Sequence, residues 1–169
     1  MSTQPGTQPD NEVLVVRTVR VPIPPERAFE LFTARMTEFW PSEHSIGGSA
    51  IAEVVVEPSA GGRWFERGVD GSECDWGQVV RWNPPGELVL LWQLGADWTF
   101  DPTLRTEVEV DFTTDGAGGT LVELRHRHLE RYGEQAETLR GIFDSPGGWR
   151  GILAHFVERA GRVAERMGG

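Results

Sequence analysis

Residues 104–112 read LRTEVEVDF, and this stretch decides the fold. Apolar or small side chains stand at every second position, and all four positions between them are charged. The charged positions are Arg105, Glu107, Glu109 and Asp111. Successive side chains of a strand point to opposite faces, so the stretch predicts a strand with one face in a core and the other in water. Val108 and Val110 are then expected on the core face.

The same two-residue period extends over most of the chain between about residues 51 and 129. We expect six strands there, near 51–57, 63–69, 73–82, 87–95, 103–113 and 120–129. Short breaks rich in Gly, Pro, Asp and Asn separate them. Connections this short join antiparallel neighbours, because a parallel pair needs a longer crossover. A further strand is expected at Val13–Val21, which is rich in β-branched residues and ends at Pro22.

Helical patterns flank the strands on both sides. From Glu26, apolar side chains recur every three or four residues, which predicts one helix and a second short one ending near Trp40–Pro41. Residues 149–167 have the same period, and we expect Ser145 and Pro146 to begin this helix as N-cap and first helical residue. The predicted fold class is α+β: a seven-stranded antiparallel sheet wrapped around a long C-terminal helix, with two short helices after the first strand.

Length and charge limit the domain count and the class of partner. The 169 residues fit one domain, and we expect a disordered tail over residues 1–12 followed by a single domain over 13–167. The formal net charge is −10, and all 16 basic residues are arginines. A field of this sign disfavours nucleic acid and anionic membranes as partners.

Three further features indicate a cytoplasmic protein. No apolar run is long enough for a membrane span, so none is expected. The first residues show neither the basic nor the apolar region of an export signal. The lone Cys74 can form no internal disulfide, as is usual in a reducing compartment.

The order of these elements, with a series of short motifs, resembles the START-like (SRPBCC) helix-grip superfamily and, within it, the family named for the activator of the Hsp90 ATPase. The motifs are Pro25-Glu26, Ala28-Phe29, Leu31-Phe32-Thr33, Phe39-Trp40-Pro41, GGRWFE at 61–66, Asp70-Gly71, Gly77-Gln78-Val79, Pro84-Pro85, Leu88, Trp92, Thr120, His126 and Gly147-Gly148-Trp149 with Leu153 and Phe156. The resemblance implies a sheet that grips a long helix, with a cavity between them that often takes hydrophobic ligands. It implies no single activity, since relatives include lipid carriers and polyketide cyclases and aromatases.

Seven tryptophans are the most unusual feature of the composition. Several indoles in one small domain favour a wide interior that they partly line. The alternative is that they only fill the core of a curved sheet. The segment 130–144 joins the last strand to the long helix. Its apolar side chains are candidates to close over a ligand, and the alternative is a fixed structural connection; they are Tyr132, Leu139, Ile142 and Phe143. The residues expected to contact a ligand are Trp64, Glu66, Trp76, Gln78, Trp92, Val108, Val110, His126, Trp149 and Leu153, with Glu66 and Gln78 as the polar groups that orient it.

Glu66 and His126 are the two candidates for chemistry. A buried Glu66 is a candidate acid or base, and the alternative is a structural ion pair with an arginine such as Arg63 or Arg81. His126 and His128 fall on one face of the last predicted strand, where they suit a cavity wall. Two imidazoles hold a catalytic metal only with a third ligand, and no spacing selects one, so we expect neither a metal nor a cofactor.

The sequence therefore favours a protein that binds a small hydrophobic or aromatic molecule without a covalent step. The first alternative is a polyketide cyclase or aromatase in which Glu66 and His126 move protons on the substrate. The second is a co-chaperone-like or stress-related interaction protein with a chaperone-type partner. A filled interior together with an exposed apolar patch would favour this second alternative.

Overall fold

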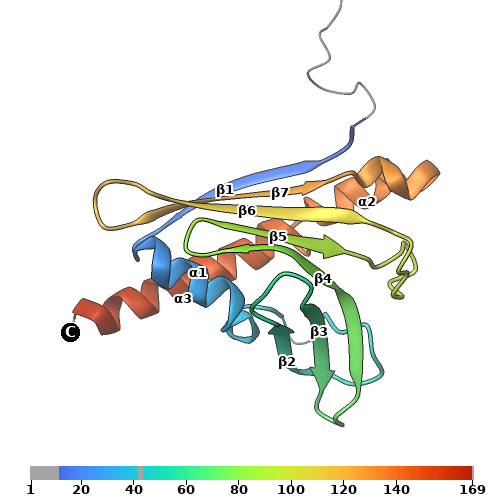
Figure 1. The fold of residues 1–169 in the computed structure, drawn as a ribbon, viewed down its shortest axis with the longest axis horizontal. Helices are drawn as coiled ribbons and strands as arrows, with labels where there is room; N and C mark the ends of the chain where they lie inside the picture. The colour runs from blue at the N-terminus through green and yellow to red at the C-terminus, as the bar shows by residue number, and fades with distance from the viewer. Residues whose placement is uncertain (1–11, 42–43, 169) are drawn as a thin grey trace, which may run out of the picture.

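The computed structural model describes residues 12–41 and 44–168. Within these ranges, seven strands form one antiparallel sheet in the order β1-β7-β6-β5-β4-β3-β2 (Figure 1). The strands are β1 (Val15–Val21), β2 (Ile51–Val56), β3 (Arg63–Gly68), β4 (Glu73–Asn83), β5 (Glu87–Trp92), β6 (Thr106–Thr114) and β7 (Thr120–Arg127). The tail predicted at residues 1–12 lies, except for Glu12, outside the described residues.

Helices lie where the sequence predicts them, after the first strand and at the C-terminal end, and two more lie within residues 129–143, where none was predicted. The C-terminal helix, α3, runs along one face of the curled sheet (Figure 1). The helices are α1 (Pro25–Thr33), η1 (Met36–Glu38), η2 (Leu129–Gln135), α2 (Ala136–Phe143) and α3 (Trp149–Gly168). The predicted helix-grip fold class is confirmed. Of the helices in the described ranges, none has both the length and the apolar character needed to cross a membrane.

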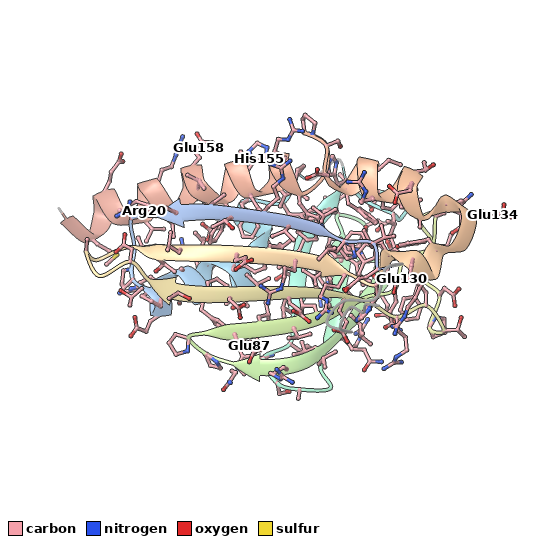
Figure 2. All side chains as sticks on the ribbon, turned by 90° about the horizontal axis from the view of Figure 1, so that it is seen from above. Arg20, Glu87, Glu130, Glu134, His155 and Glu158 are labelled. Carbon is pink, nitrogen blue, oxygen red and sulfur yellow. The ribbon has the colours of Figure 1, made fainter. Side chains whose placement is uncertain are left out.

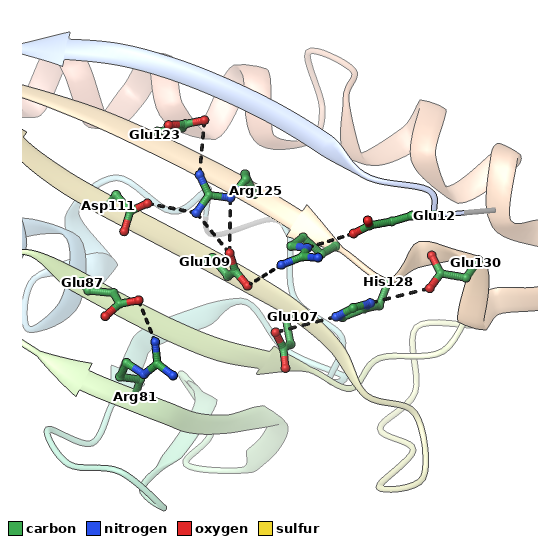
Figure 3. Close-up of polar contacts among 11 residues, drawn as sticks. Glu12, Arg81, Glu87, Glu107, Glu109, Asp111, Glu123, Arg125, His128 and Glu130 are labelled. Atoms are coloured by element: carbon green, nitrogen blue, oxygen red, sulfur yellow. Dashed lines mark hydrogen bonds and ion pairs between the residues drawn. The ribbon is translucent and has the colours of Figure 1, made fainter. Parts of the chain in front are cut away.

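The two faces of β6 and β7 differ as the alternation predicts. Val108 and Val110 are fully buried, whereas the charged side chains between them form ion pairs on the outer face. Figure 3 shows Arg125 of β7 at the centre of this layer, where its guanidinium contacts Glu109 and Asp111 of β6 at 3.1 and 2.9 Å. Ion pairs that are still partly exposed to solvent add little stability, so burial of the other face holds these strands in the fold.

The face of α3 toward the sheet is apolar along its length. Its buried side chains are Trp149, Ile152, Leu153, Phe156, Ala160 and Val163, which recur with the helical period. His155 and Glu158 point away from the sheet into solvent (Figure 2). Packing of this stripe against the inner face of the sheet encloses the core.

The start of α3 differs from the prediction, since the helix begins at Trp149 rather than Pro146. The Ser145 hydroxyl donates to the Ile142 carbonyl and so serves the end of α2. A Cβ atom at Gly148 would lie 2.4 Å from the Phe143 carbonyl oxygen, so only glycine fits this tight connection. The turn brings the end of α2 and the first residues of α3 together at one end of the sheet.

Candidate functional site

An open cavity of about 460 Å³ lies between the first turn of α3 and the sheet. The segment before β2, strands β4 and β5, the loop after β5 and the α2–α3 connection contribute its walls. Five of the seven tryptophans line it: Trp40, Trp76, Trp92, Trp98 and Trp149. The interior is therefore an aromatic chamber with a solvent-open mouth.

The indoles of this chamber hold one another in place. The ring centroid of Trp40 lies 4.9 Å from that of Trp76 and 5.8 Å from that of Trp149, and Trp149 lies 5.9 Å from Trp92. The contacts with Trp149 are edge-to-face, which is a favourable geometry for aromatic pairs. The rings of Trp40, Trp76, Trp92 and Trp149 are almost fully buried. Their packing therefore holds the cavity wall in shape without a ligand.

A chain of hydrogen bonds links the Trp149 indole to the backbone of Trp92 through His126. The Trp149 indole can only donate, and its Nε1 lies 3.0 Å from His126 Nδ1, so Nδ1 is the acceptor. His126 Nε2 then carries the proton and donates to Thr106 Oγ1 at 3.0 Å, while the Thr106 hydroxyl donates to the Trp92 carbonyl at 2.8 Å. His126 therefore joins the α3 wall of the cavity to the β5 wall.

His126 is a neutral positioning residue in this arrangement. It is fully buried beside the cavity, and both ring nitrogens are engaged. Burial lowers the pKa of its imidazole to about 3, because the charged form would lose its hydration. The predicted placement of His126 on the cavity wall is therefore corrected: it lies one layer behind Trp92 and Trp149. Its proposed role as acid or base stays a prediction, and the geometry leaves it no free nitrogen.

Burial of His126 makes stability depend on pH. The unfolded chain takes up a proton near pH 6.5, whereas the folded imidazole stays neutral until about pH 3. The stability present above pH 6.5 is thus lost progressively as the pH falls toward 3, at about 1.4 kcal/mol per unit. Urea unfolding at pH 7 and pH 5 measures this, and His126→Gln should lose about 2 kcal/mol less than the wild type between these pH values. Equal losses would contradict the assignment.

Glu66 of β3 is also buried and directed inward, but it serves a different part of the wall. Its carboxylate accepts hydrogen bonds from the Ser45 hydroxyl, from the Ile46 backbone N–H at 2.9 Å and from Trp76 Nε1 at 3.0 Å. All three donors belong to residues that line the cavity, whereas Glu66 itself does not. Glu66 therefore fastens the segment at 44–46 and the Trp76 indole to the sheet.

The arginines considered as partners of Glu66 are engaged elsewhere. Arg63 contacts Asp75 at 2.7 Å and Arg81 contacts Glu87 at 2.9 Å, both on the outer face (Figure 3 shows the second pair). The ion-pair alternative for Glu66 is therefore wrong for these two arginines. Its three hydrogen bonds come from neutral donors, which is an unusual environment for a buried carboxylate.

Four of the other predicted contact residues lie behind the cavity wall. Trp64, Val108, Val110 and Leu153 are fully buried, and none of them bounds the cavity in the described chain. They belong to the packed core that supports the lining residues Trp76, Trp92 and Trp149. Of the predicted ligand contacts, the geometry favours those of Trp76, Trp92 and Trp149, which line the cavity.

Gln78 is a correction, because it is exposed on the outer side of β4. The pairing of β3 with β4 shifts between Trp64 and Phe65, so β4 carries an extra residue near Trp76. A bulge of this kind reverses the alternation, and Gln78 no longer shares the face of Trp76. A Cβ atom at Gly77 would lie 1.8 Å from the Leu91 carbonyl oxygen, which explains the glycine within this bulge.

His128 does not share a face with His126. β7 ends at Arg127, and His128 has a φ of +66°, which turns its side chain toward the outer face. There its ring lies 3.6 Å from Glu130 and 3.9 Å from Glu107 (Figure 3). In the ranges 12–41 and 44–168, no group of three or more His, Cys, Asp or Glu side chains is arranged to hold a metal ion.

The cavity mouth holds residues that the sequence did not single out. His44, Asp97 and Thr99 line it together with Trp98, and Ile142 and Phe143 of α2 line the cavity as expected. The Phe143 ring lies edge-to-face with that of Trp98, with the centroids 6.1 Å apart. Trp98 has a φ of +63°, which is rare for a bulky residue and marks the loop after β5 as specialised. The sequence signal that could have identified this part of the site is the pair Asp97-Trp98 within a turn-rich segment.

No family model matches the chain, and neither does any curated protein. Solved structures do match. One, described as "An anthrahydroquino-Gama-pyrone synthase Txn09 complexed with SUM", is 37% identical with a TM-score of 0.62, and the match covers 86% of this chain and 96% of that one. The self-sacrificing resistance protein CalC from Micromonospora echinospora is 27% identical with a TM-score of 0.63, covering 88% and 94%. Protein MLL2253 from Mesorhizobium loti, at 20% identity and a TM-score of 0.61 over 90% and 97%, shares the fold.

Proposed function

This chain belongs to the START-like helix-grip superfamily, and from that premise we propose that it binds a small planar aromatic molecule, without a covalent step, in the cavity beneath α3. The observation that carries the proposal is the cavity lined by five indoles. Its volume of about 460 Å³ lies within the usual range for sites that enclose small organic ligands. The neighbour at 37% identity is named as a synthase of an anthrahydroquinone-pyrone, which supports a fused-ring ligand.

The physical reason is the match between the wall and such a ligand. Indole rings offer both flat faces and edges, so a fused aromatic system gains contacts with several of them at once. The wall indoles keep their positions through their mutual packing and the hydrogen bonds of His126 and Glu66. A ligand therefore meets a site that is formed in advance, which lowers the cost of binding.

Quinizarin, a neutral dihydroxyanthraquinone, is a suitable probe, and Trp98 is the residue to vary. Trp98 lines the mouth with 39% of its surface exposed, and its left-handed φ suits glycine, so Trp98→Gly should keep the fold. We expect Trp98→Gly to weaken quinizarin binding about three- to ten-fold, as the loss of one aromatic contact implies. An equilibrium titration followed by tryptophan fluorescence measures the affinity.

Phe100 provides the matched control for this variant. It lies in the same loop with similar exposure but does not line the cavity in the described chain. Phe100→Ala should therefore leave the quinizarin affinity within two-fold of the wild type, in keeping with a residue outside the site. If Phe100→Ala and Trp98→Gly weaken binding equally, or if neither does, the proposed site is wrong.

Ring closure on such a ligand is a second candidate function, favoured by the 37% identity to a protein named as a synthase. Glu66 and His126 remain the predicted acid and base, although both lie behind the wall. His44 and Asp97 are the titratable side chains that reach the cavity in the described chain. Incubating the protein with a fused aromatic precursor that carries an open side chain, and following it by mass spectrometry and chromatography, tests this candidate. An unchanged precursor would contradict it.

An interaction role with a chaperone-type partner stays a prediction. A filled interior together with an exposed apolar patch would favour it, and the interior of this protein holds an open cavity instead. The geometry therefore favours ligand binding over an interaction role.

A further inference from the structure

Within the residues that the structure describes, the cavity lining offers negative charge without an arginine or lysine to balance it. Among the lining residues in the described part of the chain, Asp97 has the one carboxylate, no arginine is present, and the whole sequence lacks lysine. His44 is the other titratable group that faces the cavity, and its Nε2 lies 3.0 Å from the Gly147 carbonyl oxygen. A carbonyl can only accept, so His44 Nε2 is a donor that is already used. The site thus offers a negative charge to a ligand and no arginine or lysine cation.

Asp97 is held in a fixed position at the mouth. Its Oδ1 accepts hydrogen bonds from the Thr99 backbone N–H at 3.2 Å and from the Thr99 hydroxyl at 2.8 Å. These bonds hold the pKa of the carboxyl group below its usual range, so it is ionised at neutral pH. The loop itself is closed by hydrogen bonds from Trp98 N to Gly95 O at 2.8 Å and from Gly95 N to Thr99 O at 2.9 Å. The second oxygen of Asp97 takes part in no hydrogen bond or ion pair with the described residues, and Asp97 lines the cavity.

An aromatic face lies next to this carboxylate. Trp98 directly follows Asp97, lines the same mouth and keeps its indole partly exposed there, in a backbone conformation that costs energy for a bulky residue. A carboxylate beside exposed indole surface is the combination that binds organic ammonium groups, through an ion pair and a cation–π contact. The ring centroid of Trp98 lies 6.1 Å from that of Phe143, which in turn lies 5.4 Å from that of Trp92, so aromatic side chains continue inward from the mouth.

We propose that the natural ligand is an aromatic molecule that carries a protonated amine, with its rings among the interior indoles and its ammonium group bound by Asp97 and Trp98 at the mouth. This inference rests on the proposed function and adds the charge of the ligand to it. The net charge of −10 acts in the same direction, since it raises the concentration of cations near the surface. Anionic aromatic acids are correspondingly disfavoured.

Two probes with the same rings and the same side chain, one charged and one neutral, test the inference. An aminoethylamino-anthraquinone carries a protonated amine on a short chain, and its N-acetyl derivative has the same rings without the charge. We expect the amine to bind about three- to ten-fold more tightly than the amide, as one exposed ion pair with a cation–π contact implies. In Asp97→Asn, whose side chain keeps the acceptor for Thr99, this difference should shrink by at least two-fold, because only the cation–π contact with Trp98 remains, with the amide affinity unchanged.

Asp101 is a matched control because it repeats the local geometry of Asp97. Its Oδ1 accepts hydrogen bonds from the Thr103 N–H at 2.9 Å and the Thr103 hydroxyl at 2.6 Å, but it does not line the cavity in the described chain. Asp101→Asn should therefore keep the full preference for the amine. Loss of the preference in both variants would show a general effect of net charge and would overturn the site.

The outcomes separate this inference from the proposed function. The inference is wrong if amine and amide bind the wild type equally. It is also wrong if Asp97→Asn keeps the full wild-type preference for the amine over the amide. Aromatic binding stands in both cases. If neither anthraquinone nor quinizarin binds, the proposed function fails and the inference fails with it.

Discussion

Replacing Trp149 by alanine should lower the free energy of unfolding by about 3–5 kcal/mol. The Trp149 ring is almost fully buried and contacts Trp40 on one side and Trp92 on the other. Alanine removes these contacts and leaves His126 Nδ1 without its donor, in a place that the core cannot refill. Urea denaturation at pH 7 measures the change.

Trp149→Phe separates packing from hydrogen bonding at this position. Phenylalanine keeps most of the aromatic contact and loses the indole N–H, so we expect a loss of about 1–2 kcal/mol. A loss below about 1 kcal/mol for Trp149→Ala would mean that α3 does not pack on the sheet through this ring. Equal losses for the two variants would show that the hydrogen bond, rather than the ring, carries the effect.

Replacing Glu66 by leucine should cost about 2–4 kcal/mol, although leucine has a similar volume and suits a buried site. The cost arises because three donors, on Ser45, Ile46 and Trp76, lose their common acceptor. The segment at 44–46 would also detach from the sheet, so quinizarin should dissociate faster from this variant. Urea denaturation and stopped-flow fluorescence measure the two effects.

Glu66→Gln is the control, because its amide oxygen still accepts from Ile46 and Trp76 while its NH₂ group can donate to the Ser45 oxygen. We expect glutamine to keep at least half of the stability that leucine loses, and to leave quinizarin dissociation within two-fold of the wild type. A Glu66→Leu variant as stable as the wild type would contradict the role assigned to this carboxylate.

The fold was predictable because its signals are local. The alternation at 104–112 marks β6 whatever its neighbours are, and the apolar stripe at 149–163 marks α3. Short turns then require antiparallel pairing, which leaves few arrangements for the sheet. The boundary of α3 was missed because Ser145 has the composition of a cap but bonds to α2 instead.

The site was predictable only in part, because its details depend on non-local geometry. The burial of Glu66 follows from its strand, but its three partners come from segments 10 to 21 residues away. The bulge that turns Gln78 outward and the left-handed residue that separates His128 from His126 break the strand period without a clear local signal. Asp97 lines the cavity because of the position of the loop after β5, and that position depends on the whole sheet.

The most direct test of an aromatic-binding cavity uses its own tryptophans. Five of the seven line the cavity, so a bound quinizarin molecule lies next to most of the indole fluorophores. Titration of the wild type with quinizarin should quench most of the tryptophan emission and saturate at one molecule per chain. Quenching that stays weak and rises linearly up to the solubility limit of quinizarin would show that no molecule enters the chamber, and would contradict the account.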